Sequence, residues 1–312
     1  MSSGGVHVSV DELVRLETQA RDLGFVQKAR SHQQLAGRMK SAMRGRGLTF
    51  EELRNYLPGD DIRSIDWRVT ARTTRPVVRV YSEEKERPAI IVVDQRINMF
   101  FGSRLSMKSV SAAEAAMLCA WRILGSGDRV GGFVIGDNNT DEVKPHRSRN
   151  AVIAFADRIA RMNAALSANA STSQKTGQLD AVLESVANVA HHDHLVVVIS
   201  DFDGHTPHTR DLLLRLSSGN DVICILVYDP FLLSLPTSGD IVVSGGGPQA
   251  ELALGTARVR SSIDTFARER GRELLAWQNA LGLPMLPVSA AEETAPQLRR
   301  LLEQSIWRQR RR

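Results

Sequence analysis

The sequence is poor in cysteine and in long apolar segments. It has two cysteines in 312 residues, and neither Cys119 nor Cys224 lies in a motif for a disulfide, a metal site or a catalytic thiol. The longest apolar runs, 195–199 and 222–228, are far shorter than the roughly 20 residues that cross a bilayer. The first ten residues lack the basic and apolar stretches of a signal peptide. We therefore expect a cytoplasmic protein without a transmembrane segment.

Motifs of the common enzyme classes are also absent. The sequence contains no G-x-x-x-x-G-K-[ST] phosphate loop, no G-x-S-x-G elbow, no H-E-x-x-H and no C-x-x-C pair. The glycines at 245–247 are not followed by a lysine that would meet a phosphate. An enzyme built on this chain would need a different set of catalytic residues.

Positive charge is concentrated in two segments of a chain whose formal net charge is +5. Residues 28–46 hold six basic residues and no acidic one, and residues 308–312 hold four arginines. Such segments can contact phosphate polymers, anionic lipid at a membrane surface or an acidic protein, or they can simply be solvated. No aromatic residues interleave with the C-terminal arginines and no nucleic-acid-binding motif occurs, so nucleic acid is not an expected ligand.

Predicted strands and helices alternate through most of the chain. The apolar strands 89–93 and 195–200 are each followed by an aspartate, and alternation with helices predicts a doubly wound, mostly parallel sheet flanked by helices. Further strands are expected at 77–82, 129–135, 222–228 and 285–288, with a hairpin formed by 241–243 and 251–254. The expected helices are 11–23, 32–43, 107–124, 151–165, 179–190, 211–216, 259–281 and a last one from 292.

Ligands of such sheets bind beyond the carboxyl ends of the strands. The candidates there are Asp94, Arg96, Asn98, Asp201, Asp203, His205 and His208. The last four of these form an acid-histidine run that can ligate Zn²⁺ or Mn²⁺. The same run is also typical of an ordinary turn before a helix, which is the interpretation that residue types favour.

The densest charged segment, residues 56–72, reads Y-L-P-G-D-D-I-R-S-I-D-W-R-V-T-A-R. Pro58 and Gly59 predict a type II turn. Asp60 is expected to cap a short helical turn, with Asp61 in its first turn, where the helix dipole favours acids.

Charges of opposite sign alternate in the second half of this segment. Arg63, Asp66 and Arg68 lie within reach of one another. We expect Asp60, Asp61, Arg63 and Asp66 to be ordered by mutual hydrogen bonds, and Ile65 and Trp67 to anchor the turn against the sheet domain. No nucleophile with a neighbouring base is visible, so residue chemistry favours a salt-bridged structural corner.

The segment resembles the signature of the domain-of-unknown-function 58 family, which comprises bacterial proteins with a von Willebrand factor A-like domain. The resemblance extends to Gly47, Phe50, Arg79 and Glu84 and covers roughly residues 35–235. It implies a Rossmann-like domain, which we place at 88–312 with a hairpin insertion near 236–256, and an N-terminal helical and β extension at 1–87. The signature residues expected to interact are Arg54, Tyr56, Pro58, Gly59, Asp60, Asp61, Arg63, Asp66, Trp67 and Arg72.

The resemblance also implies a place for a metal ion. Von Willebrand A-like domains bind a divalent cation through an Asp-x-Ser-x-Ser loop, a distant threonine and a second aspartate. The aspartates match Asp94 and Asp201, whereas the hydroxyl positions fall on Arg96, Asn98 and Gly177, with Thr176 one residue away. Lost hydroxyl ligands and a guanidinium should weaken Mg²⁺ binding. We therefore hypothesise a degenerate site in which Arg96 supplies a substitute charge between the two aspartates, and we expect no cofactor beyond weak Mg²⁺ binding.

Two functions of different class follow. Family members resemble partners of MoxR-type AAA+ ATPases, which implies a non-enzymatic, chaperone-like adaptor that acts in assembly or maturation of a client protein. Residues 28–46 are then an expected docking surface for an acidic ATPase ring. The alternative is a metal-dependent hydrolase or phosphatase-like enzyme that uses Asp94 and Asp201.

Overall fold

The structure is a computed structural model that describes residues 5–24, 48–73, 75–83, 87–168, 177–233, 235–236, 240–243, 250–253 and 256–310. The chain forms two compact units, one of residues 1–26 with 87–312 and one of residues 27–86. The predicted helix 32–43 and the basic segment 28–46 lie outside the described residues, as do Thr176 and residues 311–312.

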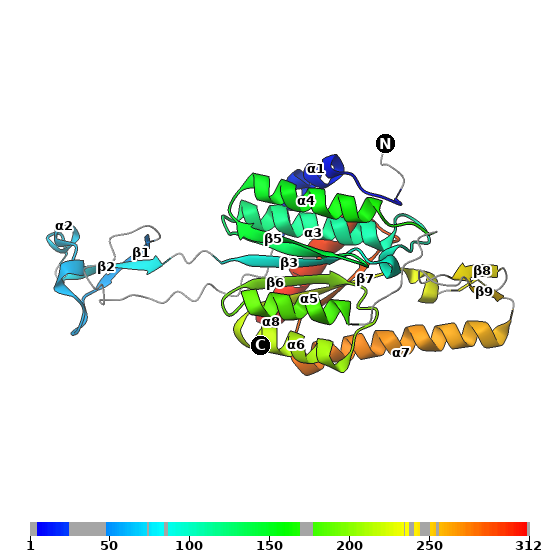
Figure 1. Cartoon of the computed structure of the whole chain (residues 1–312). Coiled ribbons are helices and arrows are strands. Elements are labelled where there is room, and N and C mark those ends of the chain that lie inside the picture. Colours follow the sequence, from blue (N-terminus) through cyan, green and yellow to red (C-terminus); the bar gives the residue numbers. More distant parts are fainter. Residues whose placement is uncertain are drawn as a thin grey trace. The chain divides into compact units, whose positions relative to one another are not determined.

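The first unit is built on a six-stranded sheet (Figure 1). All neighbouring strands pair in parallel except β4 and β5, which are antiparallel. This arrangement confirms the predicted doubly wound, mostly parallel α/β fold. In spatial order the strands are β10 (Met285–Ser289), β7 (Asp221–Tyr228), β6 (Leu195–Ser200), β3 (Ala89–Asp94), β4 (Val130–Ile135) and β5 (Thr140–His146).

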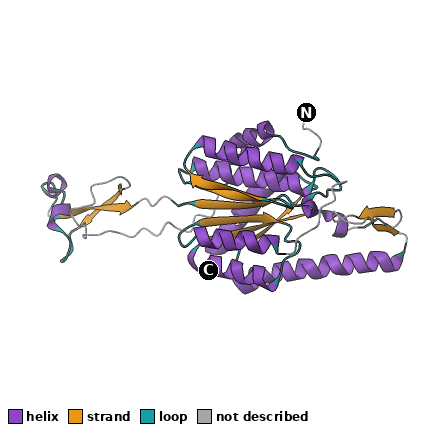
Figure 2. Ribbon diagram, viewed as in Figure 1, coloured by secondary structure: helices purple, strands orange, loops and turns teal. Residues whose placement is uncertain are grey.

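Helices cover both faces of this sheet (Figure 2). Successive residues of a strand point to opposite faces, so Ile91 and Val93 of β3 enter one hydrophobic core while Ile90 and Val92 enter the other. The first core is closed by α1 (Val10–Ala20), α3 (Lys108–Gly125), α4 (Arg149–Ala164) and α8 (Thr294–Arg310). The second is closed by α5 (Gln178–Val189), α6 (Pro207–Gly219) and α7 (Ala257–Leu281).

Helix α1 belongs to the first unit, which differs from the predicted division at residue 87. Its Leu13 and Ala20, with Leu23 just beyond it, are fully buried in the first core. Trp121 of α3 also donates a buried hydrogen bond to the backbone oxygen of Leu13 at 3.1 Å. Because these contacts cover an apolar face of α3 and α4, the N-terminal segment is a structural part of the sheet unit.

The second unit contains an antiparallel pair of strands, β1 (Leu48–Asn55) and β2 (Val77–Glu83), with an irregularity between Phe50 and Glu52. Two short helices, η1 (Ile62–Ser64) and α2 (Trp67–Thr70), lie between these strands in the sequence.

Two strands were not predicted, and both have a physical reason to escape detection. In β5 the only buried residue is Val143, so the strand lacks an alternating pattern of apolar residues. It also contains Pro145, which suits an edge strand that has no partner on one side. In β1 the polar sequence L-T-F-E-E-L-R-N and the irregularity after Phe50 break the two-residue period.

The remaining elements of the first unit are short. The predicted hairpin strands appear as β8 (Asp240–Val243) and β9 (Ala250–Ala253), and η2 (Ile97–Met99) and η3 (Pro230–Leu233) follow strands β3 and β7. Within the described residues, no helix combines the length and the apolar character needed to cross a membrane.

Gly132 in β4 gives the first prediction, because a Cβ there would lie 2.1 Å from the backbone oxygen of Ile91 and 2.8 Å from the ring of Phe155. Gly132→Ala should destabilise the protein by about 1–3 kcal/mol through overpacking. Gly271→Ala is the matched control, since its Cβ meets no atom within 4 Å in helix α7 and alanine favours a helix by roughly 0.5–1 kcal/mol. Urea unfolding measures both, and equal stability of the two variants would contradict the prediction.

Candidate functional site

The candidate site lies at the carboxyl edge of the sheet, where β3 and β6 end side by side. Their register pairs Val93 with Ile199, so Asp94 lies next to Ser200, and Asp201 follows directly. Ligands of doubly wound sheets bind beyond this edge, and the two aspartates of the sequence prediction are therefore brought together there.

Asp94 has no exposed surface, and protein donors occupy both of its carboxylate oxygens. Arg96 donates to Oδ1 from its backbone nitrogen at 3.0 Å and from Nε at 2.9 Å, and to Oδ2 from Nη2 at 2.7 Å. Ser200 Oγ donates to Oδ2 at 2.6 Å. A carboxylate offers about four acceptor positions, so those of Asp94 are filled. Burial opposes the charge of Arg96, but Asp94 outweighs this and raises the guanidinium pKa above its ordinary value.

Asp201 is neutralised by a different cation. Lys108 Nζ, at the first position of α3, donates to Oδ2 at 2.5 Å, while Asn98 Nδ2 donates to Oδ1 at 2.7 Å. The backbone nitrogen of Asp203 also donates to Oδ1 at 2.8 Å. Burial disfavours ionisation of Asp201, but the charge and hydrogen bond of Lys108 hold its pKa below the ordinary range. The carboxylate is therefore a buried anion with its own counterion.

Helix α7 contributes a third cation to this edge. Arg270 Nη1 lies 2.5 Å from Asp203 Oδ1, and Nη2 donates to the backbone oxygen of Asp201 at 3.1 Å. Arg96 Nη2 reaches the backbone oxygen of Asp203 at 3.2 Å. We call these residues the charged cluster: Asp94, Arg96, Asn98, Lys108, Asp201, Asp203 and Arg270. Three carboxylates face three cations, so the cluster is formally neutral.

The position expected to carry a threonine supplies no hydroxyl. Gly177 has a positive φ of 84° and precedes helix α5 without a side-chain cap. Nearby, the Asp137 carboxylate accepts the backbone N–H of Ile97 at 3.0 and 3.2 Å. Burial, aided by the charge of Asp94, raises the pKa of Asp137 despite that hydrogen bond.

The residues present do not fit a divalent metal ion. Mg²⁺ requires near-octahedral oxygen coordination, whereas the acceptor positions of Asp94 are filled and those of Asp201 face Lys108 and Asn98. Among the described residues, no group of three or more His, Cys, Asp or Glu side chains is placed to hold a metal. The expected bidentate pair of Arg96 forms with Asp94, whereas the salt bridge of Asp201 is with Lys108.

The acid-histidine run after β6 does not converge on one point. His205 Nδ1 lies 2.8 Å from the backbone oxygen of Phe202, and its Nε2 lies 3.1 Å from Glu273. His208 Nε2 lies 2.9 Å from Glu184, and this contact raises the His208 pKa. The histidines of the alternative Zn²⁺ or Mn²⁺ site are therefore engaged with separate partners in the described structure.

Ser200 is the one hydroxyl next to the aspartates of the charged cluster in the described structure, and it is not available as a nucleophile. It is 1% exposed, donates to Asp94 and accepts from the backbone nitrogen of Phe202 at 2.8 Å. The bond to Asp94 joins the end of β6 to the end of β3 and the bond from Phe202 orders the loop after β6, so the hydroxyl is structural.

A buried amide network connects the N-terminal segment to the site loop, which is the segment 95–107 between β3 and α3. Gln95, between Asp94 and Arg96, donates to the backbone oxygen of Ser109 at 2.8 Å and accepts from Asn163 Nδ2 at 2.9 Å. Asn163 Oδ1 in turn accepts the backbone N–H of Val8 at 2.9 Å. Removing the N-terminal segment would leave this buried acceptor without its partner, which is costly.

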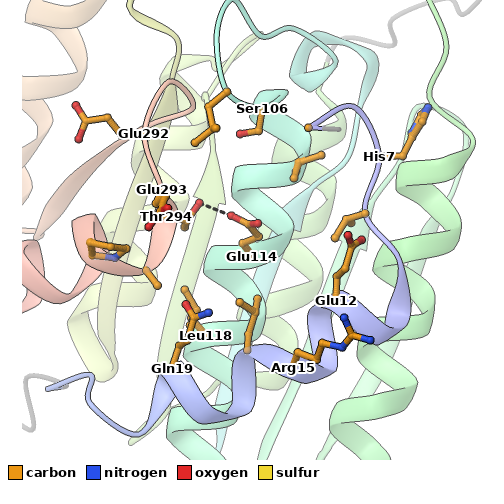
Figure 3. Close-up of a pocket in the computed structure, with 17 residues that line it drawn as sticks. His7, Glu12, Arg15, Gln19, Ser106, Glu114, Leu118, Glu292, Glu293 and Thr294 are labelled. Carbon is orange, nitrogen blue, oxygen red and sulfur yellow. Dashed lines mark hydrogen bonds between the residues drawn. The ribbon is translucent and has the colours of Figure 1, made fainter. Parts of the chain in front are cut away.

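A cavity of about 450 Å³ lies between α1, α3 and the start of α8 (Figure 3). Glu114 of α3 points into it and accepts a hydrogen bond from Thr294 Oγ1 at 2.6 Å. Burial, with the nearby charges of Glu12 and Glu293, raises the pKa of Glu114 above its ordinary value.

The first half of the charged signature forms the predicted turn but uses its acids differently. Gly59 adopts a positive φ of 106°, and the backbone nitrogen of Asp60 donates to Leu57 at 3.0 Å. The Asp60 carboxylate accepts two hydrogen bonds from Arg54 at 2.8 Å each, which lowers its pKa, and one from the backbone of Leu57. Asp60 therefore closes the turn, and Asp61 is the residue that caps η1.

The second half differs from the prediction in its ion pairs. Asp66 caps α2 and pairs with Arg79 of β2 at 2.7 Å, which lowers its pKa, whereas the predicted hydrogen bonds were with Arg63 and the other signature aspartates. Trp67 is 64% exposed, so the core of its own unit does not take up the indole. Ile65 forms an isolated antiparallel β-bridge with Val78 of β2, which lies in the same unit, so its anchoring against the sheet domain stays a prediction.

Residues 52–273 match the protein family described as "Protein of unknown function DUF58". The chain belongs to the DUF58 family. Uncharacterized proteins of Mycobacterium tuberculosis and Mycobacterium bovis are 31% identical to this DUF58 protein over 199 residues, which are 64% of this chain and 61% of theirs. The match therefore spans less than two thirds of the length of these relatives.

Two solved structures are similar to this chain at low sequence identity. The conserved hypothetical protein BatB from Bacteroides thetaiotaomicron has a TM-score of 0.40 at 13% identity, over 71% of this chain and 99% of that chain. The SpRpn10 VWA domain has a TM-score of 0.35 at 10% identity, over 70% and 95%.

Sequence reasoning missed two cations of the cluster in this DUF58 protein. Lys108 had a usable signal, because a cation at the first position of a helix is disfavoured by the helix dipole and indicates a nearby acid. Arg270 lies 67 residues after Asp203 in a helix rich in exposed arginines, so no local pattern distinguishes it. Asp137 was missed because a single acid after a strand is common in loops.

Arg96 gives the second prediction. Arg96→Ala leaves the Asp94 charge buried without its counterion and should destabilise the protein by about 3–5 kcal/mol. Arg104→Ala, which removes an exposed arginine of the same loop, should change stability by no more than about 0.5 kcal/mol. Denaturant unfolding measures the stability of both variants. A small loss of unfolding free energy for Arg96→Ala at neutral pH would contradict a stabilising Asp94–Arg96 ion pair.

Glu114 gives a pH-dependent prediction. Its raised pKa means that the folded state binds a proton more tightly than the unfolded state, so its contribution to stability is lost as pH rises through the folded pKa. Glutamine keeps an acceptor for Thr294 without the charge. The melting temperature of Glu114→Gln relative to wild type should therefore be higher at pH 8 than at pH 5. Glu292→Gln, on the exposed rim, is the control. The same melting-temperature difference between Glu114→Gln and wild type at both pH values would contradict the role assigned to the Glu114 charge.

Proposed function

We propose that this DUF58 protein is a non-enzymatic, cytoplasmic adaptor that works with a MoxR-type AAA+ ATPase in assembly or maturation of other proteins. Its degenerate metal site is proposed to act without a metal, as a fixed framework for the loops of the sheet edge. The observation that carries the proposal is the saturation of Asp94 by Arg96 and Ser200.

A saturated ion network supports binding by a rigid surface. Asp94 and Asp201 make their hydrogen bonds to donors of this chain, and these bonds join the loop after β3, the start of α3, the loop after β6 and α7. A loop that is ordered before binding loses less entropy when a partner docks on it.

The loop between η2 and α3 presents apolar side chains on this framework. Phe101 is 40% exposed and Leu105 is 52% exposed. Between them, Ser103 is bound to Asp229, from its nitrogen at 2.8 Å and from its hydroxyl at 2.6 Å. Exposed apolar groups on a fixed loop are typical of protein contact sites, so we assign this loop to partner binding.

The alternative of a metal-dependent hydrolase receives less support. It needs a cation and a water at Asp94 and Asp201, but their oxygens face arginine, lysine, asparagine and serine donors. A metal would have to displace two buried ion pairs before it met a ligand oxygen.

The proposal predicts that Leu105 contributes to binding of a MoxR-type ATPase from the same genome. Leu105→Ala should weaken binding by about tenfold, because truncation of a buried interface side chain costs more than 1 kcal/mol at a contact hot spot. Leu214→Ala is the matched control, since Leu214 on α6 is 50% exposed. Biolayer interferometry with the purified ATPase and ATP measures both.

Two results would contradict the proposal. Absence of ATPase binding by the wild-type chain would remove the partner, and equal weakening by Leu105→Ala and Leu214→Ala would remove the assigned loop. Calorimetry adds a test of the alternative, which requires tight Mg²⁺ binding that Asp94→Ala abolishes.

A further inference from the structure

We propose that a surface of the second unit, formed by the charged signature, docks an acidic segment of a partner protein. We call this the Trp67 surface, and it comprises Leu57, Ile62, Arg63, Trp67, Arg68 and Arg72. It lies in a different unit from the sheet edge, and the inference does not depend on the identity of the ATPase or on the metal-free site.

The first observation is the exposure of large apolar side chains within one short stretch. Trp67 is 64% exposed, Ile62 is 62% exposed and Leu57 is 58% exposed. Single exposed apolar residues are ordinary. Three within eleven residues, one of them tryptophan, form an exposed apolar patch of the kind that marks an interaction site. Tryptophan is also the residue type most enriched at the energetic centres of interfaces.

The second observation is that internal hydrogen bonds fix the backbone that carries these side chains. Asp60 closes the turn at Leu57, Asp61 accepts the backbone N–H of Arg63 at 2.9 Å, and Asp66 accepts those of Arg68 and Val69 at 3.0 and 3.2 Å. The side chains are therefore displayed from an ordered backbone, which reduces the entropy lost on binding.

The third observation is that two of these aspartates, Asp60 and Asp66, pair with arginines outside the surface. Asp60 pairs with Arg54 and Asp66 pairs with Arg79, and both pairs lower the aspartate pKa, so both carboxylates are ionised and engaged at neutral pH. The side chains of Arg63, Arg68 and Arg72 are exposed and have no carboxylate partner among the described residues.

Charge complementarity identifies the occupant. Arg68 and Arg72 are four residues apart across α2 and the turn that continues it, a spacing that places two side chains on one face. Guanidinium groups bind carboxylates with two parallel hydrogen bonds. The complementary ligand is a peptide segment that carries aspartate or glutamate on either side of a large apolar residue.

The surface fits a protein better than other polyanions. Single-stranded nucleic acid is held by successive stacked aromatic rings, whereas Trp67 is the one aromatic side chain of this surface. An interfacial membrane helix needs a long amphipathic face, and α2 has four residues.

A displayed library of random 12-residue peptides, selected on the full chain, tests the proposal. We expect selection of peptides rich in acids around an aromatic or aliphatic residue. Trp67→Ala and the double variant Arg68→Glu/Arg72→Glu should each weaken binding of a selected synthetic peptide at least tenfold by fluorescence anisotropy. Trp67→Phe should retain part of the affinity, which separates loss of a contact from loss of folding.

Matched controls come from exposed residues outside the surface. Leu53→Ala changes a 42% exposed leucine of β1, and Arg210→Glu reverses an exposed charge on α6; neither should alter peptide affinity. Selection of acid-poor peptides, or peptide binding that survives Trp67→Ala, would overturn the proposal. It would also fall if phosphatidylserine vesicles or a single-stranded oligonucleotide bound more tightly than the peptides and lost binding in the Arg68→Glu/Arg72→Glu variant. Failure here would leave the ATPase proposal standing, because no ATPase is present in the experiment.

Discussion

Two carboxylates at the ends of neighbouring strands must be neutralised inside the protein, and the sheet edge is organised around that need. Asp94 is fully buried and Asp201 is 8% exposed, and an unpaired buried charge is costly. Each therefore recruits a cation from another element: Arg96 from the loop after β3 and Lys108 from α3. Asp203 adds Arg270 from α7. These ion pairs join four segments, so each segment at the edge is held in place by more than one contact.

The same loop transmits this order to the N-terminal segment. Gln95 lies between the two members of the Asp94–Arg96 pair, and its amide joins Asn163, which in turn binds Val8. The loop farther on contacts the N-terminus again, since the backbone nitrogen of Met107 donates to Gly5 at 2.6 Å. Packing of α1 on the first core and hydrogen bonding of the site loop are therefore coupled, although the residues are about 90 positions apart in sequence.

The sequence predicts the fold correctly where buried strands appear as runs of apolar residues. It does not do so where contacts between distant residues determine the local structure. Strands β3 and β6 are apolar at every position before their terminal polar residues, so both the parallel sheet and the position of Asp94 follow from the sequence. Edge strand β5 buries one side chain and lacks that pattern. In the signature, residue types predicted a turn and a cap, but Asp60 and Asp61 are both good caps. The nearby guanidinium of Arg54, which no spacing rule selects, decides that Asp61 takes the capping role.

Aspartates of both units bind donors of their own chain, and this is relevant to whether the protein binds partners or catalyses a reaction. At the sheet edge and in the signature, aspartates accept hydrogen bonds from arginine, lysine and backbone N–H groups of their own chain. Both carboxylate oxygens of Asp94 and of Asp201 are consequently engaged by donors of the chain itself. What reaches the surface instead are apolar side chains such as Leu105 and Trp67, with exposed arginines beside the latter. Catalysis needs reactive groups that meet the substrate, whereas recognition of a protein needs apolar anchors and complementary charge on a fixed backbone. This distribution of contacts therefore supports the two proposals of protein binding made above.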